Sequence, residues 1–153
     1  MPPPVVILAA PAHSSEDSGV GCATTRHLPH RVVVLAADDH IRTTWRRELE
    51  PVRTVHLLGD TAAVNEAIQL IRTHRPSIIV LDPSIPGWHP ATVIRAIRQW
   101  APVGAAILAV RPTHSSVQHS VSSDELRQAG ATLCSSTQDR LSSLLSSLPA
   151  RSA

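Results

Sequence analysis

From Arg31 onward the chain alternates short apolar runs with longer stretches in which apolar residues recur at helical spacing. The run at residues 32–36 is entirely apolar, as expected of a strand in a parallel sheet that is covered on both faces. Further strands are predicted at residues 52–58, 77–81, 105–110 and, more weakly, 131–134. Gly59, Asp60 and Thr61 are expected to break the second strand. The pattern therefore predicts five strands.

A predicted helix follows each of these strands. The first helix covers residues 41–49, Pro90 opens the third, and a short fourth helix is expected at about residues 124–129, with Gly130 as its stop. The expected buried stripes are Val64, Ala67, Ile68 and Ile71 in the second helix, Val93, Ile94, Ile97 and Trp100 in the third, and Leu141, Leu144, Leu145 and Leu148 in the last. Five alternations of strand and helix predict an α/β fold, an open parallel sheet with helices on both faces.

Three acidic residues follow two of the predicted strands. Asp38 and Asp39 come after the first strand, and Asp82 comes after the third. In sheets of this kind ligands bind beyond the carboxyl ends of the strands. Three converging carboxylates repel one another unless a cation is present, and Mg²⁺ prefers such oxygen ligands. A different interpretation stays open for Asp38 and Asp39, because Asp is a common capping residue before a helix such as the one expected at residue 41.

These acids lie in segments that resemble the signatures of a response-regulator receiver domain of the CheY-like superfamily. The triplet Asp38-Asp39-His40, the segment Asp82-Pro-Ser-Ile-Pro-Gly, and Gln-Ala-Gly-Ala at residues 128–131 are similar in particular to the NarL/FixJ subfamily. The resemblance covers about residues 31–148. It implies a flavodoxin-like, doubly wound five-stranded sheet of order 2-1-3-4-5. It also implies that Asp82 accepts a phosphoryl group from a histidine kinase, and that Asp38, Asp39 and Asp82 hold magnesium.

The chain departs from the receiver pattern at two positions near this site. Arg111 follows the fourth strand, where the family places Thr or Ser, and the position of the family's lysine after the fifth strand falls at about Thr137. All 14 basic residues are arginine, so no lysine fills that place. One hypothesis is that Arg111 and Thr137 exchange roles, the arginine supplying the charge and the threonine the hydroxyl. The alternative is that both are ordinary surface residues.

Two further departures concern the switch that the resemblance implies. The fifth strand carries Leu133 or Cys134 where the family has Tyr or Phe. Trp88 follows the Asp82 segment, either as a partner contact or as a ring packed over its own loop. We interpret Cys134 as a small core residue, because no cationic neighbour that would make it reactive is evident from the sequence.

Composition and charge exclude several other classes of protein. The longest apolar runs are far shorter than the roughly 20 residues of a membrane span. The net charge is +2 and the arginines are scattered, which does not indicate a nucleic-acid-binding surface. Cys22 and Cys134 lie far apart without a CxxC motif, which argues against a zinc site and a disulfide framework. A cytoplasmic location is expected.

The sequence divides into three predicted segments and is compatible with three functional interpretations. Residues 1–30 are expected to be a disordered tail, residues 31–148 the receiver domain, and residues 149–153 a short tail. The first interpretation is a stand-alone receiver, not an enzyme, that acts by protein contact with a sensor histidine kinase or phosphotransfer protein, a downstream protein and a possible second copy. The second is a pseudo-receiver that binds a partner regardless of phosphorylation. A small metal-dependent hydrolase is the third, but the chain lacks the Asp-x-Asp of aspartyl-phosphate enzymes.

Overall fold

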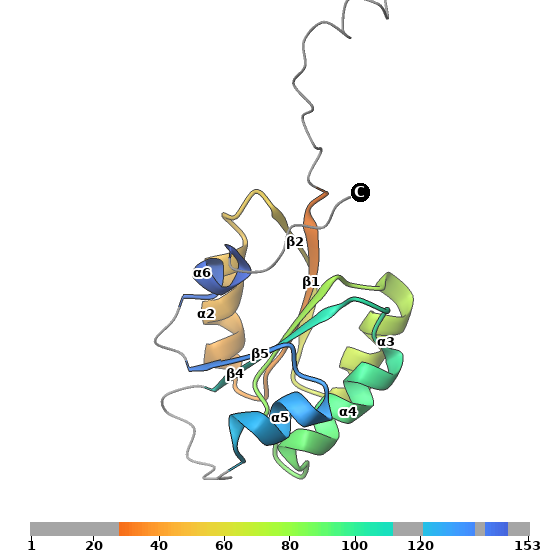
Figure 1. The fold of residues 1–153 in the computed structure, drawn as a ribbon. Coiled ribbons are helices and arrows are strands. Elements are labelled where there is room, and N and C mark those ends of the chain that lie inside the picture. Colours follow the sequence, from red (N-terminus) through yellow and green to blue (C-terminus); the bar gives the residue numbers. More distant parts are fainter. Residues whose placement is uncertain (1–27, 112–120, 137–139, 147–153) are drawn as a thin grey trace, which may run out of the picture.

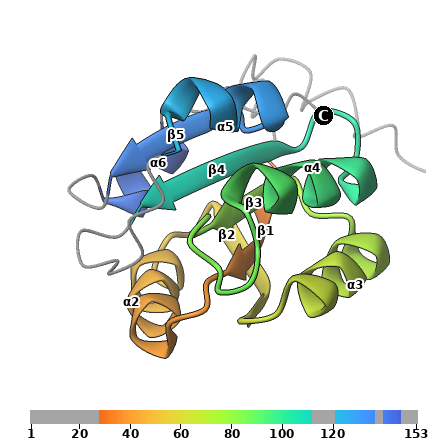
Figure 2. The same cartoon turned by 90° about the horizontal axis from the view of Figure 1, so that it is seen from below.

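The computed structural model describes residues 28–111, 121–136 and 140–146. Five strands form one sheet of order β2-β1-β3-β4-β5, and every neighbouring pair is parallel (Figure 2). The strands are β1 (His30–Leu35), β2 (Val55–Thr61), β3 (Ile78–Leu81), β4 (Ala106–Arg111) and β5 (Leu133–Ser136). The helices are α2 (Asp39–Leu49), α3 (Val64–His74), α4 (Pro90–Trp100), α5 (Ser123–Ala129) and α6 (Leu141–Ser146). The predicted fold class and strand order are confirmed.

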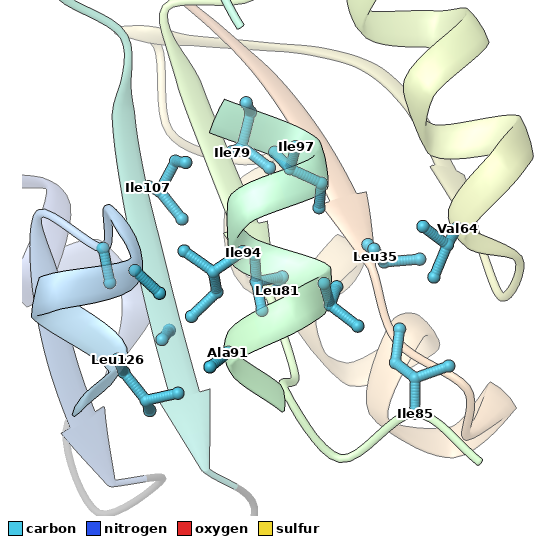
Figure 3. Packing of buried hydrophobic residues seen from close by; sticks show 14 of the residues in the cluster. Leu35, Val64, Ile79, Leu81, Ile85, Ala91, Ile94, Ile97, Ile107 and Leu126 are labelled. Atoms are coloured by element: carbon cyan, nitrogen blue, oxygen red, sulfur yellow. The ribbon is translucent and has the colours of Figure 1, made fainter. Parts of the chain in front are cut away.

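Helices cover both faces of the sheet, α2 and α6 on one face and α3, α4 and α5 on the other (Figure 1). Successive strand residues point to opposite faces, so β3 sends Ile78 and Val80 to the α2 side and Ile79 and Leu81 to the other. All four are buried. Figure 3 shows α4 lying over the second face. Burial on both sides explains why the strand is uniformly apolar.

The helix boundaries follow from local chemistry. Pro90 stands in the first turn of α4, where its missing N–H costs no hydrogen bond. Gly130 ends α5 with φ of 125°, a conformation that L side chains rarely adopt. Both predictions at these positions are confirmed. The short α6 is held to α2, because the Leu141 N–H donates to the Glu48 Oε2 atom at 3.1 Å.

Two strand predictions were displaced. Gly59, Asp60 and Thr61 do not break β2 but pair with the last three residues of β1. The register shifts between Val32 and Val33, and the pairing resumes beyond this irregularity, so an apparent break in the sequence continues as strand. The fifth strand begins at Leu133, two residues after its predicted start.

The predicted buried position of Trp100 was wrong. Trp100 is the last residue of α4 and is 44% exposed, while the three preceding stripe residues, Val93, Ile94 and Ile97, are fully buried. Its ring stacks on the guanidinium of Arg72 from α3, 4.6 Å from the ring centroid. A cation–π contact at the helix end replaces core packing.

The remaining predictions about chain organisation fall largely outside the described residues. The tail expected at residues 1–30 overlaps them only at residues 28–30, of which His30 already belongs to β1. The C-terminal tail and Leu148 lie outside them. Among the described helices, none has both the length and the apolar character needed to cross a bilayer.

Candidate functional site

The carboxyl ends of β1 and β3 lie side by side at one edge of the sheet. Leu35 pairs with Leu81, the last residues of these strands, and the Asp82 N–H donates to the Leu35 carbonyl at 2.9 Å. This pairing brings the segment after β1, which carries Asp38 and Asp39, next to Asp82. The position matches the place where ligands bind in doubly wound sheets.

Asp82 is the buried acid of this edge. Its side chain is only 3% exposed, and its Oδ1 atom accepts the Ser84 N–H at 2.9 Å. Burial raises the pKa of Asp82, hydrogen bonds from the backbone and side chain of Ser84 act in the opposite direction, and the charge of Asp38 raises it further. A carboxylate that is costly to ionise therefore lies beside a second negative charge.

Asp38 caps α2. Its Oδ1 atom accepts the N–H groups of His40 at 2.8 Å and of Ile41 at 3.4 Å. The capping interpretation is thus confirmed for Asp38. Capping is compatible with a role in a cluster of acids, because the charge of Asp38 also acts on Asp82. The Asp38 carboxylate therefore both caps α2 and raises the pKa of Asp82.

Asp39 is on the surface and is paired with Arg42. Its side chain is 89% exposed, and its Oδ1 atom accepts a hydrogen bond from Arg42 at 2.8 Å. Within the described ranges, no group of three His, Cys, Asp or Glu side chains is placed to hold a metal ion. The structure therefore brings Asp38 and Asp82 together but does not bring Asp39 to them.

The donor chemistry of the site nevertheless fits magnesium. This ion keeps several of its waters and is commonly held by only one or two carboxylates together with phosphate oxygens. Asp38 and Asp82 supply two carboxylates whose mutual repulsion a cation would relieve. Asp39 lies in the same segment as Asp38, but its carboxylate is bound to Arg42.

Arg111 is directed elsewhere. Its guanidinium donates to the Val121 carbonyl, and its charge acts on the Cys134 thiol, whose pKa is raised mainly by burial. Thr137 lies outside the described residues, so the exchange of roles between the two stays a prediction.

Two residues near the acids were missed from the sequence. Ser84 has only its spacing as a signal, since a residue two positions after Asp commonly donates its N–H in a turn. Arg42 lies at i+3 from Asp39, which is the spacing of a helical ion pair. Arg111 and Arg127, the cationic neighbours of Cys134, were also missed, because α5 and the end of β4 bring them there only in the folded chain.

Trp88 lies on the loop that follows Asp82. Trp88 is 37% exposed, and its backbone N–H donates to the Ile85 carbonyl at 3.1 Å. Gly87, with φ of 82°, makes the turn before it. The ring is therefore partly covered and partly accessible, and both interpretations of Trp88 remain open.

Known proteins resemble this chain in sequence and share its fold. No protein-family model matches the chain. The sequence is 32% identical over 74 residues to the probable transcriptional regulatory protein NarL of Mycobacterium tuberculosis, a match that covers 47% of this chain and 34% of that protein. A two-component response regulator of the LuxR family from Aurantimonas sp. SI85-9A1 superimposes with a TM-score of 0.64 at 25% identity, covering 77% of this chain and 81% of that one. The chain is therefore similar in both sequence and fold to response-regulator receiver domains.

Two further solved structures share this fold. The signal receiver domain of the response regulator NarL from M. tuberculosis has a TM-score of 0.64 at 22% identity, covering 78% of this chain and 95% of that one. A response regulator from Burkholderia pseudomallei, solved with a phosphorylated aspartic acid, a calcium ion and citrate, also has a TM-score of 0.64, at 18% identity, covering 78% and 66%. The matched segment spans about a third of the length of the curated relatives.

Proposed function

We propose that Asp82 is the phosphoacceptor of this receiver and that its donor is the phosphohistidine of a sensor histidine kinase or phosphotransfer protein. The observation that carries the proposal is the buried carboxylate of Asp82 at the carboxyl end of β3, next to Asp38. A carboxylate oxygen would attack phosphorus as the bond from phosphorus to the histidine nitrogen breaks, and the imidazole would leave with the electron pair. We expect this exchange in the cytoplasm, from the resemblance to other receivers.

Asp82 must be ionised to act as a nucleophile. Its burial and the charge of Asp38 oppose ionisation, whereas the bonds from Ser84 favour it and fix the orientation of the carboxylate. A magnesium ion held by Asp38 and Asp82, with Asp39 as the expected third acid, would supply positive charge for the transferring group. The phosphorylated aspartic acid and calcium ion of the B. pseudomallei regulator support this proposal by analogy.

The output of the receiver would be a protein contact. Phosphorylation adds charge and acceptor oxygens, which bias a surface with two arrangements. In receivers that surface is normally formed by the fourth and fifth helices, which correspond here to α5 (Ser123–Ala129) and α6 (Leu141–Ser146), and it also serves for homodimers. We expect the downstream protein, or a second copy of this chain, to bind there.

Intact-mass analysis tests the phosphoacceptor directly. After incubation with acetyl phosphate and magnesium, the wild type is expected to gain one phosphoryl group, and Asp82→Asn to gain none. Asp124→Asn, which removes an exposed acid on α5, is the matched control and is expected to gain one group like the wild type. A phosphoryl group on Asp82→Asn, or none on the wild type, would contradict the proposal.

A second candidate function is a phosphorylation-independent pseudo-receiver. Two observations favour it: the sequence contains no lysine, and Asp39 is turned toward Arg42 instead of Asp82. Under this alternative the chain gains no mass and binds no magnesium, and a partner binds wild type and Asp82→Asn with equal affinity.

A further inference from the structure

Arg42 lies against the end of β1, beside the acids. Its guanidinium donates to the Ala36 carbonyl at 2.7 Å and to the Ala37 carbonyl at 3.3 Å. It also contacts the Asp39 Oδ1 atom at 2.8 Å and lies 3.5 Å from the Asp60 Oδ2 atom of β2. A fixed positive charge is thus built into the edge of the sheet where the proposed cation would bind.

The two partners of the Asp39–Arg42 pair differ in how firmly they are held. The Arg42 side chain is 15% exposed and is fixed by two backbone carbonyls and by Asp60, which is itself bound to Arg46 at 2.6 Å. The Asp39 side chain is 89% exposed at the first residue of α2. If the pair separates, Arg42 keeps its other partners and Asp39 is the side chain that moves.

We propose that Arg42 is a positioning residue that withholds Asp39 from a divalent cation and thereby sets the affinity of the site for Mg²⁺. This inference rests on the proposed function, because it assumes that the acids bind magnesium. The cation and the guanidinium compete for the Asp39 carboxylate. Because the ion pair must break before Asp39 can bind Mg²⁺, the free energy of binding is less favourable. The positive charge of Arg42 also repels the arriving cation.

Neutralising Arg42 is expected to strengthen magnesium binding. Arg42→Gln removes the charge but keeps an amide that can donate to the Ala36 carbonyl. The dissociation constant for Mg²⁺, followed by NMR titration of backbone amides with MgCl₂ alone, is expected to fall about twofold to fivefold, since exposed ion pairs are weak. Arg47→Gln removes the same charge from an exposed position on the same helix and is the matched control, with an expected change of less than about twofold.

A double substitution separates competition for Asp39 from simple charge repulsion. In an Asp39→Asn background, Arg42→Gln is expected to lose most of its effect on the dissociation constant. A second measurement needs no substitution at all. The guanidinium NMR signal of Arg42 in the wild type is expected to shift during the MgCl₂ titration with the same midpoint as the backbone amide of Ser84.

The outcomes distinguish this inference from the proposed function. If the wild type binds Mg²⁺ and Arg42→Gln binds it no more tightly than Arg47→Gln, the inference is wrong and the proposed function stands. An equal gain in the Asp39→Asn background also overturns it. If only Arg42→Gln binds Mg²⁺, the inference is supported. Absence of binding in every variant overturns both the inference and the proposed role of magnesium, while Asp82 remains testable by intact mass.

Discussion

At the scale of single residues, three neighbouring acids have three different environments. Asp82 is buried, Asp38 is bound to the first N–H groups of α2, and Asp39 is exposed and paired with Arg42. These differences follow from backbone position, because Asp82 directly follows a central strand whereas the other two lie at the start of a helix on the surface. A negative charge is therefore energetically unfavourable on the buried Asp82 and much less so on Asp38 and Asp39.

The buried charge of Asp82 gives a pH-dependent stability. Because its pKa is higher in the folded than in the unfolded chain, the folded state binds a proton more readily, and the free energy of unfolding falls as pH rises through the range between the two pKa values. Asp82→Asn is therefore expected to raise the melting temperature at pH 7, and the gain is expected to shrink as the pH is lowered toward the pKa of an unfolded Asp. Thermal unfolding at a series of pH values measures both. Asp124→Asn is the control, and a melting temperature for Asp82→Asn at or below that of the wild type at pH 7 would contradict the argument.

Asp38 allows capping to be separated from charge. Asn caps a helix as well as Asp does but carries no charge, whereas Ala does neither. Both substitutions relieve the repulsion with Asp82, so the difference between them isolates the cap. Asp38→Ala is expected to be about 1 kcal/mol less stable than Asp38→Asn in urea unfolding. Equal stabilities would show that the bonds to His40 and Ile41 contribute nothing.

At the scale of elements, Arg98 ties α4 to the last two strands. Its guanidinium donates to the Gly130 carbonyl, to the Ala105 carbonyl at 2.7 Å and to the Thr132 hydroxyl at 3.3 Å. Burial lowers the pKa of Arg98, because water is partly excluded from around its charge. These bonds satisfy carbonyls just before β4 and before β5, and so link a helix to the segments that lead into these two strands.

Replacing Arg98 tests this link. Arg98→Met keeps much of the aliphatic stem and removes every hydrogen bond, and we expect the free energy of unfolding to fall by about 2–3 kcal/mol, since bonds from a charged donor are strong. Arg95→Met changes an exposed residue of the same helix and is expected to stay within about 0.5 kcal/mol of the wild type. Urea unfolding of both variants measures the difference. If they are equally stable, Arg98 does not hold α4 to the sheet.

At the scale of the whole molecule, two apolar clusters stabilise the two faces of one sheet, and Figure 3 shows residues of the cluster under α4. The larger helix layer lies on the α3–α4–α5 side. On the other side α6 has only six residues, all of them Leu or Ser, and two of these, Leu141 and Leu145, are buried. A helix this short is unstable alone, so its docking onto α2 decides whether it forms.

Leu141 is the test of that docking. Its side chain is 1% exposed and packs in the cluster beneath α2. Leu141→Ala is expected to lower the free energy of unfolding by about 2–5 kcal/mol and to speed amide hydrogen exchange in α6. Ser143→Ala, at an exposed position of the same helix, is the control and is expected to change stability by less than about 0.5 kcal/mol. A small effect of Leu141→Ala would mean that α6 does not belong to the stable core.

The sequence by itself determined the fold class, the strand order through a family resemblance, and the positions of Asp38, Asp39 and Asp82 after β1 and β3. The reason is that an apolar run such as β3, with acids or turn residues at its ends, can be recognised from the local sequence alone. This local preference agrees with the position of the strand in the folded sheet. Pro90 and Gly130 set helix boundaries for equally local reasons. Magnesium binding and phosphorylation at these acids stay predictions.

Only the tertiary structure decided which side chains of the acidic edge meet. Asp39 turns to Arg42 because that guanidinium is fixed by the carbonyls of Ala36 and Ala37 and by Asp60, an arrangement that requires β2 to lie beside β1. Gly59 is part of β2 because it pairs with β1, and Arg72 of α3 stacks on the ring of Trp100. Each of these contacts depends on a neighbour that is distant in sequence or on a competition between partners, and hydrophobic periodicity carries no information about either.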